Sequence, residues 1–290
     1  MKLPISVIIL TFNEENNLPD CLVSLQDLTE EVFVVDSGST DHTLEIAREW
    51  GAEVVEHPFQ NYGQQRNWAL DNLPLRFEWT LQLDADHRVT PELRASLQNL
   101  FNPLPPDAVQ GYMVSRRTMF LGKWIRHGGH YPVYHAVLFR RQAGRCEDKL
   151  YDQHFVVQGT VRKLRGDIVD VITDSLTTFT ERHNRWSYLE AAEQSNSNRQ
   201  AGERRIQPRM TGTPMEQRRF LKSAYERWPL FVRPFLYFIV RYFFRLGFLD
   251  GRRGLIFHLL QGFWFRFLID AKILEQRYRN KTPGHENKPR

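Results

Sequence analysis

Leu3–Thr11 reads LPISVIILT, a continuous apolar run rich in β-branched side chains. Such a run is expected of a strand that is buried on both faces of a parallel sheet. A β-then-α rhythm continues from it, with further strands predicted at 32–35, 52–56, 79–83, 111–120 and 136–141 and helices at 18–28, 41–50 and 64–73. Short connections between such units favour right-handed crossovers. The sequence therefore predicts an α/β fold with a doubly wound, mostly parallel sheet.

The composition is that of a globular protein. The 290 residues are 41% hydrophobic and 25% charged, which suits one large domain or a catalytic domain with an appendage. Two cysteines, Cys21 and Cys146, are too few for a disulfide framework and favour a reducing compartment. The first residues lack a signal-peptide pattern, and no stretch reaches about 18 uncharged apolar residues. We therefore expect a cytoplasmic protein without a membrane-spanning helix.

The charged residues divide the chain into two halves. Residues 1–198 hold 19 Lys and Arg against 27 Asp and Glu, a net charge of −8, whereas residues 199–290 hold 20 against 7, a net charge of +13. We predict an acidic domain over residues 1–198, with halves at 1–110 and 111–198. Residues 199–290 are predicted to form a basic linker and an amphipathic helical region.

Aromatic residues gather in the basic half. The segment from Trp228 to Phe267 carries 14 of the chain's 37 aromatic residues, interleaved with arginines. This pattern suits a membrane interface, where rings lie at headgroup level and arginines reach anionic phosphates. The alternative is a helical hairpin that packs on the domain, with arginine stems covering apolar surface. We favour peripheral membrane binding over that packing, and both over nucleic-acid binding.

Polar residues follow three of the predicted strands, at Thr11–Glu15, Asp36–Asp41 and Asp84–His87. Ligands of open α/β sheets bind beyond the carboxyl ends of the strands, so these side chains are expected on one rim. The glycine-rich phosphate loops of dehydrogenases and P-loop NTPases are missing from the sequence. Two carboxylates in Asp84-Ala85-Asp86 instead suit Mg²⁺ or Mn²⁺, and such an ion binds a diphosphate. Asp36 and Asp41 also have an ordinary interpretation as turn and helix-cap residues.

Three motifs resemble, in order and separation, the nucleotide-sugar motifs of the family 2 glycosyltransferases with the GT-A fold. These are Val7–Glu14, Val34–Asp41 and Leu83–Asp86. Trp124–Pro132 and Gly247–Gly251 resemble a bacterial branch of the family that builds cell-surface polysaccharide or lipopolysaccharide. The resemblance implies a GT-A catalytic domain over residues 1–198, with the nucleotide-sugar-binding half at 1–110 and the acceptor half at 111–198.

What the resemblance implies is an inverting transfer from a nucleoside-diphosphate sugar. The donor-site residues that it implies are Thr11, Asn13, Glu14 and Asp36 for the base and ribose, Arg66 near the ribose and diphosphate, Asp84 for the ribose or metal and Asp86 as the main metal ligand. The segment around Arg66 has the alternative interpretation of a solvated helix face.

Inversion needs a general base that deprotonates the acceptor hydroxyl as it attacks the anomeric carbon. The expected position lies well after Asp84-Ala85-Asp86, on the acceptor side. Three acids there are candidates, Asp152 first and then Asp148 and Glu147. We choose Asp152 for its place shortly before Val156–Gly159. Each acid is weighed against being an exposed loop residue.

Processive members of the family carry Gln-x-x-Arg-Trp after the base, whereas this chain has Arg182-His183-Asn184-Arg185-Trp186. We therefore expect one sugar to be added per encounter, although Arg185 and Trp186 also suit an ordinary helix. The expected protein is a metal-dependent glycosyltransferase, peripheral on the cytoplasmic membrane face, with a glycolipid or lipid-linked saccharide acceptor. The alternatives are a soluble transferase with a protein or small-molecule acceptor, and an inactive nucleotide-sugar-binding scaffold.

Overall fold

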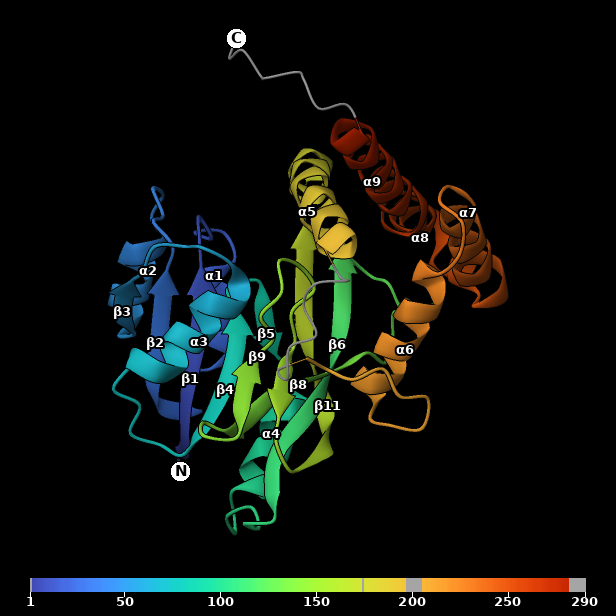
Figure 1. Cartoon of the computed structure of the whole chain (residues 1–290). Coiled ribbons are helices and arrows are strands. Elements are labelled where there is room, and N and C mark those ends of the chain that lie inside the picture. Colours follow the sequence, from blue (N-terminus) through green and yellow to red (C-terminus); the bar gives the residue numbers. More distant parts are fainter. Residues whose placement is uncertain (1, 174, 197–204, 282–290) are drawn as a thin grey trace.

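The structure, a computed structural model, describes residues 2–173, 175–196 and 205–281. Within these residues the core is one mixed sheet with the strand order β3-β2-β1-β4-β8-β6-β11-β5, and β7 pairs with β6 at its side (Figure 1). The strands of this sheet are β1 (Leu3–Thr11), β2 (Thr29–Asp36), β3 (Glu53–Glu56), β4 (Trp79–Asp84), β5 (His87–Val89), β6 (Val109–Phe120), β7 (Lys123–Trp124), β8 (Tyr134–Arg140) and β11 (Thr160–Thr173). A separate two-stranded ribbon pairs β9 (Gly144–Cys146) with β10 (Phe155–Val157).

The first half of the sheet is built on β1, which pairs in parallel with β2 on one side and β4 on the other. Alternate residues of β1 face opposite cores: Val7 and Ile9 belong to one apolar cluster, and Ile8 and Leu10 to the other. Burial on both faces explains why the run is apolar throughout rather than alternating. The predicted α/β fold is confirmed, and strands β1 to β4 are paired with one another in parallel only.

Helices cover both faces of this parallel part. The helices of the first half are α1 (Leu18–Ser24), α2 (Thr43–Trp50), α3 (Tyr62–Asn72) and α4 (Pro91–Leu100). Apolar side chains of α1, α2 and α4 pack in the cluster of Ile9, whereas Ala69 and Leu70 of α3 pack in the cluster of Ile8. This two-sided packing is the doubly wound arrangement.

The second half of the sheet contains one long strand, β11, that was not predicted. It runs parallel to β6 and antiparallel to β5. Its register shifts between Lys163 and Asp167, where Gly166 has a φ of +96°. The irregularity interrupts the period of two by which a half-buried strand is recognised, and charged residues fill much of this segment. Strand β11 matters because it carries Asp170 to the end of the sheet where β4 ends.

Helices and turns make up the C-terminal part. They are α5 (Leu176–Asn196), α6 (Pro214–Glu226), α7 (Val232–Ile239), the π-helical turn η2 (Val240–Phe244), the 3₁₀ turn η3 (Gly247–Asp250), α8 (Gly251–Phe257), the π-helical segment η4 (His258–Trp264) and α9 (Phe265–Lys281). A buried pair joins α7 to α9, because Arg233 Nε donates to Asp270 Oδ1 (2.8 Å). The predicted boundary at 198/199 lies outside the described residues. Among the described helices, none combines the length and apolar character needed to cross a bilayer.

We predict that Gly166→Ala strongly destabilises the protein. The left-handed φ disfavours a side chain, and the new Cβ would overlap the backbone of Leu93 at the start of α4. The expected loss in the free energy of unfolding is about 3 kcal/mol or more, measured by urea denaturation. Gly122→Ala is the control, since Gly122 also has a positive φ but no atom within 4 Å of the new Cβ. Equal losses in the two variants would contradict the packing of β11 on α4.

Candidate active site

A cleft of about 620 Å³ opens at the carboxyl ends of β1 and β4. One wall comes from the parallel half of the sheet and the other from β6, β11 and α5. The polar and aromatic side chains that line it include Thr11, Glu14, Ser37, Tyr62, Asp84, Asp86, Arg116, Asp170, Arg182, Arg185, Trp186 and Gln261. Residues that are far apart in the sequence thus meet where ligands of α/β sheets bind.

Asp36 organises the rim of the cleft at the end of β2. Its buried carboxylate accepts hydrogen bonds from Thr11 Oγ1 (2.9 Å) and from the backbone N–H groups of Gly38 and Ser39 (both 2.8 Å). A carboxylate with both oxygens engaged in this way fixes a turn. Asp36 is not among the residues that line the cleft. It positions Thr11 and the turn after β2, in agreement with its alternative interpretation as a turn residue. Its predicted contact with a nucleobase remains a prediction.

The loop after β1 is tied to the same turn. Asn13 has a φ of +53°, and its Oδ1 accepts a hydrogen bond from Thr40 N (2.8 Å). Its own backbone N–H donates to Ser39 Oγ (2.8 Å). Glu14 lines the cleft, and burial raises the pKa of its carboxyl group. Thr11 and Glu14 therefore face the cleft as expected, whereas Asn13 holds two loops together.

Asp84, Asp86 and His87 form a compact group at the end of β4. One ligand atom from each lies within 4.8 Å of the others. Asp84 N donates to His87 Nδ1 (3.0 Å), so the neutral ring carries its proton on Nε2, 3.6 Å from Asp84 Oδ2. Burial and Arg116 lower the pKa of His87 to about 3, so the ring is neutral near pH 7. Because Nδ1 already accepts a hydrogen bond and Nε2 carries the proton, the two carboxylates are the available ligands, and oxygen donors fit Mg²⁺ or Mn²⁺.

Charge around the carboxylates is unevenly compensated. Arg66, buried on α3, forms an ion pair with Asp84 and also donates to Gln82 Oε1 (3.3 Å). Burial opposes ionisation of Asp84, but Arg66 and the other neighbouring cations lower its pKa overall. Asp86 differs, because burial and the nearby Asp170 and Asp84 carboxylates raise its pKa well above the usual value. A cation bound here would relieve that repulsion, so the donor set fits a divalent metal.

Several cleft residues were not identified from the sequence as site residues. Asp170 of β11 lies 3.7 Å from Arg116 of β6, measured from Oδ2 to Nη1, and both line the cleft. Arg185 and Trp186 also line it, although an ordinary helical role was considered for them. Sequence reasoning missed Asp170 because β11 was not recognised as a strand. A polar strand end facing the end of β4 was the signal that could have indicated it.

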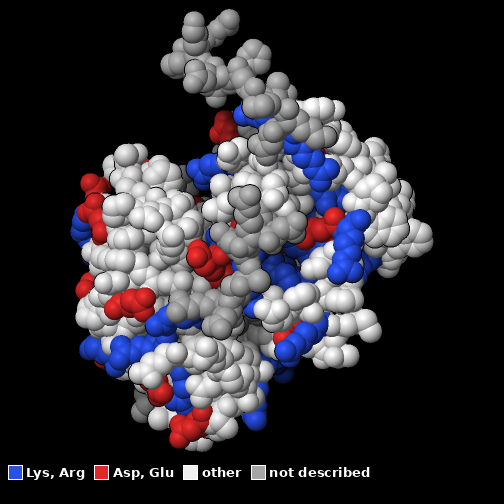
Figure 2. All heavy atoms as spheres, in the orientation of Figure 1, with Lys and Arg blue, Asp and Glu red and all other residues white. Residues whose placement is uncertain are grey.

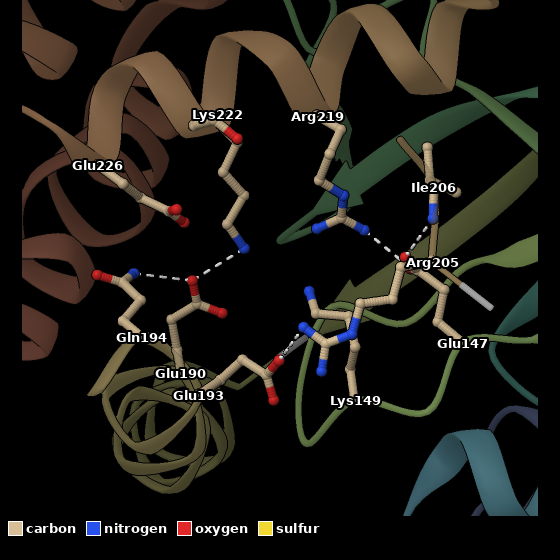
Figure 3. Close-up of a pocket in the computed structure, with 11 residues that line it drawn as sticks. Glu147, Lys149, Glu190, Glu193, Gln194, Arg205, Ile206, Arg219, Lys222 and Glu226 are labelled. Carbon is tan, nitrogen blue, oxygen red and sulfur yellow. Dashed lines mark hydrogen bonds and ion pairs between the residues drawn. The ribbon is translucent and has the colours of Figure 1, made fainter. Parts of the chain in front are cut away.

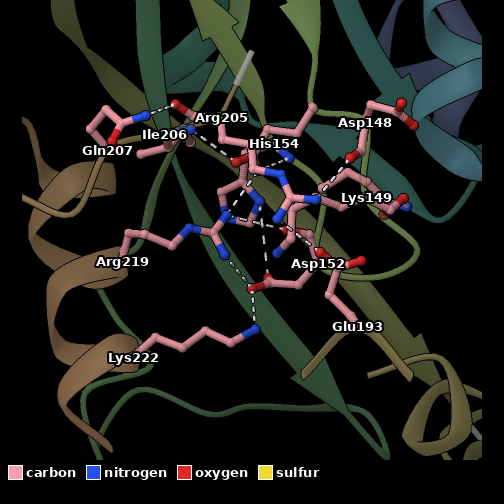
Figure 4. A network of polar contacts seen from close by, with 12 residues as sticks. Asp148, Lys149, Asp152, His154, Glu193, Arg205, Ile206, Gln207, Arg219 and Lys222 are labelled. Carbon is pink, nitrogen blue, oxygen red and sulfur yellow. Dashed lines mark hydrogen bonds and ion pairs between the residues drawn. The ribbon is translucent and has the colours of Figure 1, made fainter. Parts of the chain in front are cut away.

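The three acids considered for the general base lie outside the residues that line the cleft. Asp152 is held by α6, with its Oδ2 2.9 Å from Lys222 Nζ and 3.4 Å from Arg219 Nη1 (Figure 4). Its neighbour Tyr151 does line the cleft. Burial opposes ionisation of Asp152, but Lys222, His154 and Arg219 hold its pKa well below the usual range.

Glu147 is buried and structural in this conformation. Its carboxylate accepts hydrogen bonds from Arg219 Nη2 (2.8 Å) and from Ile206 N (2.9 Å). Asp148 is exposed. Glu147 also borders a second, smaller cavity of about 120 Å³, across which charged side chains of α5 and α6 face one another (Figure 3). In that cavity Lys222 Nζ lies 2.8 Å from Glu190 Oε1, so the network joins α6 to α5.

We predict that Asp86→Asn removes divalent-metal binding without weakening the fold. The variant loses one of the two carboxylates and also a repulsion with Asp84 and Asp170. MnCl₂ at a hundredfold excess over its Kd is expected to stabilise the wild-type protein by about 2.7 kcal/mol in the free energy of unfolding. Its melting temperature should rise accordingly. The variant should melt at or above the metal-free wild-type temperature and show no such shift. Asp27→Asn, at an exposed site away from the cleft, is the control. A full manganese shift in Asp86→Asn would disprove this metal site.

Comparisons with known proteins identify a family model and several relatives that match this chain. Residues 6–168 match the family model described as glycosyl transferase family 2. The lipopolysaccharide core biosynthesis glycosyltransferase LpsC of Rhizobium meliloti (strain 1021) is 28% identical over 291 residues, covering 98% of this chain and 96% of that protein. An uncharacterized glycosyltransferase of Rickettsia typhi is 33% identical over 118 residues, so this chain covers 40% of that relative's length and the match spans 41% of this chain.

Among solved structures, glucosyl-3-phosphoglycerate synthase from Mycobacterium tuberculosis, in complex with Mn²⁺, UDP and glucosyl-3-phosphoglycerate, is 21% identical. The match has a TM-score of 0.37 and covers 49% of this chain and 58% of that one.

The family model spans more than half of the 290 residues, from β1 into β11. The chain therefore belongs to glycosyl transferase family 2, as the motifs after β1, β2 and β4 indicated.

Proposed function

We propose that the protein is a metal-dependent glycosyltransferase that transfers one sugar, with inversion, from a nucleoside-diphosphate sugar to a membrane-associated saccharide acceptor. The observation that carries the proposal is the pair Asp84 and Asp86 at the end of β4, inside a cleft large enough for a nucleotide sugar. Family membership and the similarity to LpsC support the same chemistry.

The cleft offers matching groups for each part of such a donor. Exposed aromatic side chains of Phe12, Phe59 and Tyr62 lie at its edge, where they suit stacking on a nucleobase. Arg182 and Arg185 of α5 also line the cleft, and guanidinium groups match phosphate oxygens. A divalent ion, when bound by Asp84 and Asp86, would supply positive charge for the departing diphosphate.

The general base is proposed to be Asp152, with Asp170 as the competing acid. For Asp152 to accept a proton, its ion pairs with Lys222 and Arg219 must loosen when the acceptor binds, because they hold its pKa low. Its φ of +58° is uncommon for a residue with a side chain, although aspartate adopts it more readily than most. Asp170 is favoured by its place in the cleft lining.

Peripheral membrane binding is proposed for the C-terminal helices, for which a cytoplasmic location at the inner membrane face remains the expectation. Large apolar side chains are exposed along α7 and η2, among them Phe235, Val240, Phe243 and Phe244. Surface of this kind is uncommon on a monomeric soluble protein and marks a membrane or protein contact. In Figure 2, Lys and Arg atoms gather in the half of this face that contains the C-terminal helices, and uncharged surface extends beyond them. The two alternatives are that this surface forms a dimer in a soluble transferase, and that the chain is an inactive scaffold.

Activity is tested with a panel of nucleoside-diphosphate sugars and a bacterial envelope extract as acceptor. We expect the wild-type protein to release nucleoside diphosphate only with Mn²⁺ or Mg²⁺ present. Asp152→Asn should lower kcat by about 10²- to 10⁴-fold with little change in the donor KM, because a base acts on the acceptor proton and not on donor binding. Glu193→Gln, an acid on α5 outside the cleft lining, is the control.

Three outcomes distinguish Asp152 from Asp170 as the general base, and the transferase from the inactive scaffold. A large kcat loss in Asp170→Asn together with near wild-type activity in Asp152→Asn would assign the base to Asp170. A near wild-type rate in both variants would contradict both assignments. No nucleoside diphosphate released from any donor, with either ion, would favour the scaffold over the transferase.

For the membrane, we predict that Phe243→Asp/Phe244→Asp weakens sedimentation with phosphatidylglycerol vesicles at least about tenfold. Each phenylalanine is more than half exposed and would bury its ring in the bilayer interface, worth roughly 1.5–3 kcal/mol. Wild-type binding should also weaken as salt increases, since arginines contribute to it. Val23→Asp, an equally exposed apolar site on α1, is the control. Unchanged vesicle binding in the double variant would favour the soluble transferase. So would a wild-type dimer that becomes a monomer in the double variant.

A further inference from the structure

Three arginines converge between the C-terminal helices and the second half of the sheet. Arg218 comes from α6, Arg241 from η2 and Arg266 from α9. The guanidinium carbons of Arg266 and Arg241 lie 3.6 Å and 5.1 Å from the centre of the Tyr237 ring. Arg218 Nη1 lies 3.5 Å from His135 Nε2 on β8. We refer to Arg218, Arg241 and Arg266 as the arginine cluster.

The positive charge of the arginine cluster is not balanced by carboxylates. Across residues 2–173, 175–196 and 205–281, no Asp or Glu forms an ion pair with any of its three members, and acids of the surrounding elements pair with other basic side chains. These other pairs are Asp152 with Lys222, Asp170 with Arg116, Asp250 with His127 and Asp270 with Arg233. The Nε atoms of Arg241 and Arg266 are buried without a hydrogen-bond partner. Buried N–H donors left in this state cost stability, so a native structure that keeps them favours an acceptor-rich, anionic partner.

The effect of this charge extends to neighbouring side chains. Burial together with Arg241 holds the pKa of His130 well below its usual value, so that ring adds no further charge near pH 7. Burial alone would raise the pKa of the Tyr237 hydroxyl, yet Arg241 and Arg266 lower it to about 8. The surroundings therefore favour a negative group strongly enough to draw a phenol toward ionisation.

The chain segment between Arg241 and Arg266 contributes one residue to the lining of the cleft. Gln261 lines the cleft from η4, and Arg266 follows at the start of α9. Tyr151 also lines it, and its ring centre lies 6.1 Å from that of Phe265. Arg116, in the cleft wall, is among the cations that lower the pKa of Arg218. One acceptor molecule would then place its anionic group at the arginine cluster and its hydroxyl in the cleft.

The opposite side of the same elements is apolar. On η2, Arg241 belongs to the cluster, whereas Val240, Phe243 and Phe244 are exposed. A ligand that reaches from the exposed apolar side chains of η2 toward the cleft would meet first an apolar surface and then the arginine cluster. This sequence of environments matches an amphiphile with an apolar anchor and an anionic group next to its sugar.

We propose that Arg218, Arg241 and Arg266 bind a phosphate group carried by the saccharide acceptor and thereby orient the acceptor hydroxyl in the cleft. Guanidinium groups present paired N–H donors that match phosphate oxygens, so arginines suit this role better than lysines. The assignment of the phosphate to the acceptor rests on the proposed transferase function. The binding of a phosphate group by the cluster does not.

Phosphate binding is tested first, with the full chain and inorganic phosphate as the probe. The melting temperature is measured against sodium phosphate, with sodium chloride at equal ionic strength as reference. We expect a saturable rise for the wild-type protein and an apparent Kd at least about tenfold higher for Arg218→Gln/Arg241→Gln. Arg252→Gln/Arg253→Gln removes the same charge from exposed positions on α8 and should behave as the wild type. Equal phosphate affinity in the two double variants would overturn the site. Arg218→Gln alone, at an exposed side chain, gives the same test if the double variant does not fold.

The source of the phosphate is tested by transfer to an envelope extract before and after treatment with alkaline phosphatase. For an acceptor phosphate, treatment raises the wild-type acceptor KM at least about tenfold and leaves that of Arg218→Gln/Arg241→Gln unchanged. Both double variants then bind phosphatidylglycerol vesicles equally, since each loses two charges. Loss of vesicle binding in Arg218→Gln/Arg241→Gln alone would assign the site to bilayer headgroups and overturn the acceptor assignment. If the wild-type protein releases no nucleoside diphosphate from any donor, the proposed function fails, and the phosphate titration still decides whether the cluster binds anions.

Discussion

Electrostatic repulsion among carboxylates at the end of β4 is the constraint on which the rest of the site depends. Arg66 forms an ion pair with Asp84, and Arg116 with Asp170, whereas among the described residues Asp86 has no arginine or lysine within ion-pair distance, and His87 Nε2 lies 3.9 Å from its Oδ1. Burial strengthens the repulsion because it removes screening water. The chain keeps these acids together at a cost in stability, and a divalent cation would offset that cost. Such arrangements are found where function, rather than folding, sets the sequence.

The parallel half of the fold and its carboxylates could be predicted because local signals agree there. Apolar runs identify β1, β2 and β4, and the rule that ligands bind at strand ends locates Asp84 and Asp86. The opposite wall could not be predicted in the same way. Strand β11 is polar and is interrupted at Gly166, so Asp170 had no recognisable strand to place it. Nor could the sequence show that α6, far along the chain, holds Asp152 with two cations.

The C-terminal elements beyond α5 contribute Gln261 of η4 to the lining of the cleft. Several of their apolar side chains are exposed, whereas Arg241 and Arg266 lie against the Tyr237 ring. Sequence composition indicated a basic and aromatic region but could not separate these two faces, because the π-helical turns shift the helical period. The elements proposed to hold the protein at a bilayer, α7 and η2, lie in the same C-terminal part as η4, which contributes Gln261 to the cleft. We infer that the acceptor is recognised at some distance from the reacting carbon, which is how remote contacts support transfer.

The central claim is that a cation held by Asp84 and Asp86 binds the diphosphate of the donor. Isothermal titration calorimetry with nucleoside diphosphates tests it most directly, comparing protein in excess MnCl₂ with protein in EDTA. We expect one or more nucleoside diphosphates to bind about a hundredfold more tightly with manganese, a difference of about 2.7 kcal/mol in binding free energy. Equal affinities with and without manganese, for every nucleoside diphosphate that binds, would contradict it.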